Sequence, residues 1–86
     1  MAEENISKAE SIKELVRFVA ESLVDKPEEV SVTLKEEETS VTVQLSFAQD
    51  DMGKVIGKQG RIAKAIRTVV KAASVKEDKK YIVEIL

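Results

Sequence analysis

The stretch Gly53-Lys-Val-Ile-Gly-Lys-Gln-Gly-Arg61 decides the fold, because two of its glycines, three positions apart, stand between two segments of helical periodicity. We expect a short helix over Met52–Ile56, a break at Gly57-Lys-Gln-Gly60 and a second helix from Arg61 onward. Glycine lets the backbone approach a ligand without interference from a Cβ atom. The first amides of the following helix are unpaired and carry the positive end of its dipole, so a phosphate can bind there. The segment therefore predicts a phosphate-binding turn between two helices.

Basic residues surround this turn. Six Lys or Arg residues and no acidic residue lie between Gly53 and Val75. The whole chain carries a net charge of −2, but residues 1–51 hold 13 acids and 5 bases (−8), whereas residues 52–86 hold 3 acids and 9 bases (+6). On the second helix, Lys64, Arg67 and Lys71 cluster opposite the apolar stripe. Such a row either attracts a polyanion or is only a solvated helix face.

The composition argues against most catalytic functions. A chain of 86 residues forms one domain. It has no Cys and no His, which removes thiol nucleophiles, thiolate zinc sites and the commonest general acid–base. The glycine spacing is one residue too short for a Walker A loop, and Gln59 stands where its magnesium-binding hydroxyl would be. We expect no enzyme, no metal and no cofactor. An enzymatic alternative would need Asp50 and Asp51 to bind a metal, but both residues are typical helix N-caps.

No targeting or membrane segment is expected. The start, Met1-Ala-Glu-Glu-Asn5, is acidic, whereas a secretory leader needs a basic and then an apolar stretch. No apolar run approaches the roughly 20 residues of a membrane span. We therefore expect a cytoplasmic protein.

A first helix is predicted from a capping box at Ser11–Glu14, with a start a turn or more earlier, near Ser7, as the alternative. The apolar residues that follow have the spacing of one buried helical stripe, and Pro27 ends the helix near residues 25–26. Phe18 lies outside the stripe, so it is either a peripheral core contact or part of an exposed patch for self-association.

Three strands complete the predicted fold. Alternating apolar residues predict strands over 30–34 and 41–47, joined as an antiparallel hairpin through Glu36-Glu-Glu38. The last strand, 81–86, has apolar residues on both faces and is expected to be well covered. It follows a helical crossover, so it lies parallel to the second strand. The fold class is α+β, in the order α-β-β-α-α-β, with a three-stranded mixed sheet covered on one face by three helices.

The segment Val55-Ile-Gly-Lys-Gln-Gly60 resembles the G-x-x-G loop of KH domains, which clamp about four nucleotides of single-stranded RNA or DNA. The helix-first order resembles the bacterial type II KH fold. The longer stretch 51–67 resembles the small single-KH proteins of the KhpA family. The resemblance implies a single KH domain over residues 11–86, preceded by a flexible extension over residues 1–10. One position departs from the KH pattern: Ala63 stands where Ile is usual, and Ile62 precedes it.

The resemblance also implies the binding residues. The G-x-x-G positions would clamp the phosphate backbone, an aliphatic side chain before them would form an apolar floor for bases, and flanking cations would contact phosphates. These RNA-binding residues are Lys54, Ile56, Gly57, Lys58, Gln59, Gly60, Arg61 and Lys64.

The function implied is that of a non-catalytic, single-stranded RNA-binding protein, a post-transcriptional regulator or RNA chaperone. With only three aromatic residues in the chain, base stacking at about 1–3 kcal/mol per base contributes little. Weak binding by one domain favours pairing of clamps. Family resemblance implies a homodimer and a heterodimer with a larger KhpB/Jag-type KH protein. The alternative is a protein-interaction or dimerisation subunit whose RNA contact is incidental.

Overall fold

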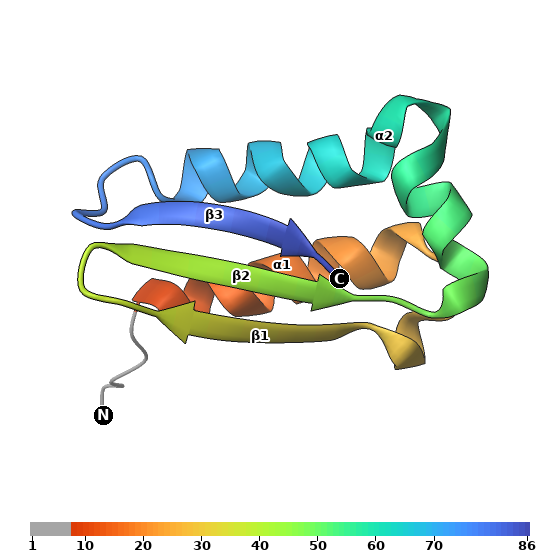
Figure 1. Ribbon diagram of the computed structural model, residues 1–86, viewed down its shortest axis with the longest axis horizontal. Coiled ribbons are helices and arrows are strands. Elements are labelled where there is room, and N and C mark those ends of the chain that lie inside the picture. Colours follow the sequence, from red (N-terminus) through yellow and green to blue (C-terminus); the bar gives the residue numbers. More distant parts are fainter. Residues whose placement is uncertain (1–7) are drawn as a thin grey trace.

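The computed structural model describes residues 8–86, apart from the side chain of Lys58, and shows an α+β fold (Figure 1). Its elements are α1 (Lys8–Leu23), the 3-10 helix η1 (Pro27–Glu29), β1 (Ser31–Glu36), β2 (Ser40–Ser46), α2 (Gln49–Ala73) and β3 (Lys80–Ile85). The helix α2 bends sharply, so we distinguish its N-terminal limb (residues 49–58) from its C-terminal limb (residues 61–73). With the two limbs counted separately, the predicted order α-β-β-α-α-β is confirmed.

The sheet has the predicted mixed topology, with strand order β1-β2-β3. β1 pairs antiparallel with β2, placing Val32 opposite Leu45. β2 pairs parallel with β3, placing Val43 beside Val83. The central strand β2 therefore contributes to both pairings, and β1 and β3 are the edges.

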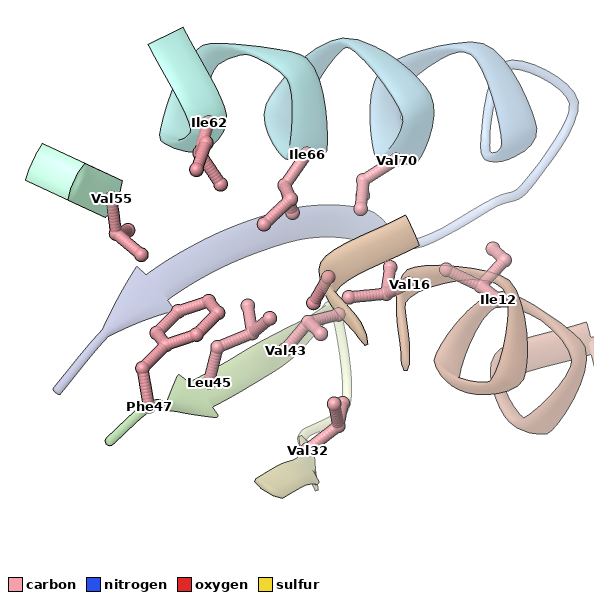
Figure 2. Close-up of a cluster of buried hydrophobic side chains, with 11 residues drawn as sticks. Ile12, Val16, Val32, Val43, Leu45, Phe47, Val55, Ile62, Ile66 and Val70 are labelled. Carbon is pink, nitrogen blue, oxygen red and sulfur yellow. The ribbon is translucent and has the colours of Figure 1, made fainter. Parts of the chain in front are cut away.

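The core lies between one face of the sheet and the helices. Strict alternation in β2 buries every second side chain, because successive side chains of a strand point to opposite faces. Figure 2 shows side chains from α1, from the sheet and from both limbs of α2 directed toward one another. The cluster comprises Ile12, Val16, Ala20, Val32, Val43, Leu45, Phe47, Val55, Ile62, Ile66 and Val70.

The start of α1 follows the earlier of the two predicted positions. The helix begins at Lys8 rather than at a cap on Ser11, and Ala9 is already buried. The predicted extension over residues 1–10 therefore overlaps α1 at residues 8–10, and its first seven residues lie outside the described part of the chain. Phe18 is 68% exposed, so of its two predicted positions the peripheral core contact is wrong.

The expected covering of β3 is also wrong. Tyr81, Val83 and Ile85 face the core side and are half-buried, whereas Ile82 is 41% and Leu86 62% exposed. The helices cover only one face of the sheet, and Ile82 lies beside Thr42 on the other face. Apolar residues on both sides of an edge strand thus do not imply burial on both sides.

Candidate nucleic-acid interface

The bend in α2 is built by two successive left-handed residues. Gln59 and Gly60 both have φ of +64°, a conformation that costs an ordinary L-residue about 1–2 kcal/mol. Helical geometry continues through Gly57 and Lys58, so the chain breaks at the last two residues of the predicted four-residue interruption. Figure 1 shows the consequence: the N-terminal limb rises away from the end of β2, and the C-terminal limb returns along the sheet.

The glycines leave the turn open. A Cβ atom added to Gly57 or to Gly60 would meet no other atom within 4 Å. Packing inside the molecule therefore does not require glycine at either position. Gly60 is needed for its positive φ, while the space beside Gly57 is free for a group that approaches the backbone from outside.

The side chains next to the turn are exposed. Ile56 is 57% exposed, which is unusual for a large apolar residue in a limb that packs on the core. Gln59, Arg61 and Lys64 are exposed as well. The turn thus combines accessible backbone, an apolar surface and cations, the groups that suit a phosphate strand with bases attached.

One predicted phosphate contact is engaged within the protein. The Lys54 ammonium lies 3.0 Å from the Asp25 carboxylate, with the two side chains 45% and 75% exposed. Exposed pairs of this kind contribute little free energy, so Lys54 can exchange its partner at low cost. The side chain of Lys58 lies outside the described part of the structure.

A buried carboxylate anchors the N-terminal limb. Asp51 is 1% exposed, and its two oxygens accept the backbone N–H groups of Asp25 and Lys26 at 3.1 and 3.0 Å. The prediction that the aspartates cap α2 is wrong, because α2 begins at Gln49 with Ala48 at the N-cap. Asp51 instead ties the first turn of α2 to the segment that follows α1.

An exposed ion pair lies beside this anchor. The Lys26 ammonium donates a hydrogen bond of 2.7 Å to Asp50. That bond and the opposite charge hold the pKa of Asp50 below its ordinary 3.8 and raise the pKa of Lys26 above 10.5. Asp50 and Asp51 therefore have separate partners, and among residues 8–86 no group of three acidic side chains is placed to hold a metal ion.

The structure contains a basic pocket that was not predicted from the sequence. It has a volume of about 500 Å³ and lies between the end of the C-terminal limb and the start of β3. Its lining includes Arg67, Lys71, Val75, Lys79, Lys80 and Tyr81. The basic row on the helix was visible in the sequence, but Lys79 and Lys80 join it only because β3 runs back along α2.

The two strand aromatics differ in position. Phe47 belongs to the core, as predicted, so it cannot stack on a base. Tyr81 is half-buried and lines the basic pocket. Burial raises its pKa above the ordinary 10.0, with further contributions from the negative charges of Glu77 and Glu36.

Comparison with known proteins gives one family. The family model described as "KhpA/KhpB, KH domain" matches residues 13–85. The RNA-binding protein KhpA of Clostridium perfringens is 63% identical over 75 residues, which cover 87% of this chain and 100% of that protein. The proteins of the same name from Listeria monocytogenes and Borreliella burgdorferi are 53% and 45% identical, covering 87% and 85% of this chain and 99% and 89% of their own lengths. No solved structure matches the chain. Among residues 8–86, no helix is both long and apolar enough to cross a membrane.

Proposed function

The chain belongs to the KhpA/KhpB KH-domain family, and on that basis we propose that it is a non-catalytic protein that clamps single-stranded RNA at the bend of α2. The observation that carries the proposal is the pair of left-handed residues, Gln59 and Gly60, at an open turn beside the exposed Ile56. The relatives from Clostridium perfringens and Listeria monocytogenes are named as RNA-binding proteins.

The proposed clamp works through the backbone first. The amides at the start of the C-terminal limb lie at the positive end of its dipole and bind a phosphate. Arg61 and Lys64, both exposed, add charge next to this position. Lys54 joins them by exchanging Asp25 for a phosphate. Base recognition then falls to Ile56 and to hydrogen bonds, because Phe47 is in the core.

Such a clamp is weak and tolerant of sequence. Phosphate contacts carry no base information, and the turn has no stacking platform. We propose that the protein acts as a dimer, alone or with a larger KhpB-type protein, because two linked clamps gain avidity without new contacts. Its setting would be the cytoplasm, where RNA chaperones and post-transcriptional regulators meet their targets.

The test is a charge change confined to the turn. The double variant Lys58→Asp/Gln59→Asp is compared with Lys8→Asp/Ser11→Asp, which introduces the same change of charge on exposed positions of α1. We expect both variants to melt near the wild type in circular dichroism and only the turn variant to lose RNA. With three or four phosphate contacts at about −0.7 each, the log–log salt slope of the wild type should be about −2 to −3. Normal RNA binding by the turn variant would refute the clamp.

An interaction subunit is the second candidate function, and the exposure of Phe18 favours it. Phe18 is 68% and Leu15 41% exposed on the solvent side of α1. A protein whose role is assembly would lose its function with Phe18→Gln, which leaves the turn intact. RNA crosslinking in cells with each variant separates the two candidates: the clamp requires loss with the turn variant alone.

A further inference from the structure

Two exposed ion pairs join the segment after α1 to the N-terminal limb of α2. The Lys26 ammonium lies 2.7 Å from the Asp50 carboxylate, and the Lys54 ammonium lies 3.0 Å from the Asp25 carboxylate. Asp50 and Lys54 have the i, i+4 spacing at which opposite charges on one helix can pair. Asp50 is held by Lys26 instead, so the anion beside Lys54 is Asp25. Lys54, one of the predicted phosphate contacts, thus already has an anionic partner within the protein.

The main chain of Asp25 is held in place independently of its side chain. The backbone N–H groups of Asp25 and Lys26 donate to the two carboxylate oxygens of Asp51, at 3.1 and 3.0 Å. Asp51 is 1% exposed, whereas the Asp25 side chain is 75% exposed. Loss of the contact between Asp25 and Lys54 therefore leaves the segment in position. The Asp25 carboxylate stays close to Lys54 even when another anion takes that ammonium.

The Asp25 carboxylate therefore competes with any phosphate that approaches Lys54. A group tethered by a short link acts at a roughly millimolar effective concentration. Lys54 lies three residues before Gly57, about 4.5 Å along the helix axis, so a strand held at the turn presents a neighbouring phosphate as a second tethered anion. Ion pairs between exposed side chains contribute little free energy. Carboxylate and phosphate can thus exchange on Lys54 without a change of fold.

We propose that Asp25 is an internal competitor that limits the affinity of the protein for RNA. Its carboxylate holds Lys54 until a phosphate of the bound strand displaces it, and it takes Lys54 back as the strand leaves. This role of Asp25 rests on the proposed function, because it requires RNA at the bend of α2. The cations around the turn strengthen binding, whereas Asp25 weakens binding and speeds release, which suits a protein that must let its RNA go.

The same substitution at two carboxylates tests this role. Asp25→Asn removes the competitor, whereas Asp50→Asn removes one negative charge from the pair that does not involve Lys54. Binding of a fluorescently labelled uridine decamer is measured by anisotropy, and its release by stopped flow. We expect Asp25→Asn to bind about two- to five-fold more tightly than Asp50→Asn, mainly through slower dissociation. Equal affinities of the two variants would overturn the competition.

A background without Lys54 separates direct competition from a general effect of charge. Lys54→Gln removes the ammonium beside Asp25, so Asp25→Asn/Lys54→Gln and Asp50→Asn/Lys54→Gln should bind the decamer alike. A gain from Asp25→Asn that persists in this background would refute the competition. Salt gives an independent check, because it screens the pair between Asp25 and Lys54. The advantage of Asp25→Asn should be greatest at low ionic strength, and an advantage of the same size at every salt concentration would contradict the competition.

Folding and RNA binding are measured separately. Circular dichroism melts of Asp25→Asn and Asp50→Asn should lie close to the wild type, because each change affects only an exposed ion pair. If the wild type binds no decamer, the proposed clamp fails, and the competition with it. If the wild type binds the decamer and Lys54→Gln binds it equally well, the clamp stands without Lys54 and only the competition fails.

Discussion

Replacement of Asp51 by Asn tests how the N-terminal limb of α2 is held. Asp51 is 1% exposed and accepts two backbone N–H groups, from Asp25 and Lys26. The amide of Asn is nearly isosteric, so it leaves no cavity. It keeps one acceptor oxygen and presents an NH₂ donor to the second N–H, which then loses its partner.

The expected loss follows from these two bonds. A hydrogen bond to a charged group contributes about 1.5–3 kcal/mol, and a neutral one about 0.5–1.5 kcal/mol. One bond of Asp51 is lost and the other becomes neutral, while water reaches the part-buried amides and offsets some of the cost. We expect a loss of about 2–3 kcal/mol. At about 0.05–0.15 kcal/mol per residue, the free energy of unfolding of the whole chain is about 4–13 kcal/mol. The expected loss is therefore a large share of the total stability.

Thermal denaturation measures the effect, and Asp50→Asn is the matched control. The same chemical change one residue earlier affects only the exposed pair with Lys26 and should leave the melting temperature nearly unchanged. For a domain of this size, each kcal/mol corresponds to about 4–8 °C, so Asp51→Asn should melt about 8–24 °C lower. Equal melting temperatures for the two variants would show that Asp51 does not anchor the limb.

Three further predictions follow from single positions. Gly60→Ala should destabilise the fold by about 1–2 kcal/mol because of the positive φ, whereas Gly57→Ala, which meets no atom within 4 Å, should melt at or above the wild-type temperature. The Tyr81 phenol should titrate above pH 10.0, because burial and then the charge of Glu77 raise its pKa; absorbance at 295 nm follows it, and stability should be full below pH 10.0 and fall as the phenol ionises. Phe18→Gln should change the unfolding free energy by less than about 0.5 kcal/mol, since the ring is 68% exposed, and a larger loss in urea denaturation would mean that the ring packs on the domain.

The sheet was predictable because successive side chains of a strand point to opposite faces. The sequence alone therefore identifies the residues that face the core. The alternation around Val43 and Leu45 gave the buried face, and the short connection 36–38 gave the antiparallel pairing. The glycine pair gave the bend for a similar reason, since backbone conformation at Gly60 is a local property. Residues at the margin of a helix stripe, such as Phe18, were not predictable from period alone, because the width of the buried stripe depends on which neighbours cover it.

The tertiary roles of charged residues could not be obtained from the sequence. Asp51 has the residue type and the position that are typical of a helix N-cap. Its hydrogen-bond donors, however, are the backbone N–H groups of Asp25 and Lys26, which only folding brings close to it. The pocket is similar, because Lys71 and Lys80 are separated by the connection between α2 and β3. Sequence rules such as helix capping consider only neighbouring residues as partners. They fail where a backbone segment that is distant in the sequence supplies the partner instead.

The parallel pairing of β3 with β2 governs the order in which the sheet can assemble. β1 and β2 are joined through residues 37–39 and can close as a hairpin within microseconds. β3 must wait until segment 47–79 has reversed direction, a long-range closure of the sort that slows folding. Until the left-handed pair at residues 59 and 60 is formed, the apolar side of the hairpin lacks its second helical cover. The bend is thus required by the parallel topology of the sheet itself, because it returns the chain to the start of β2.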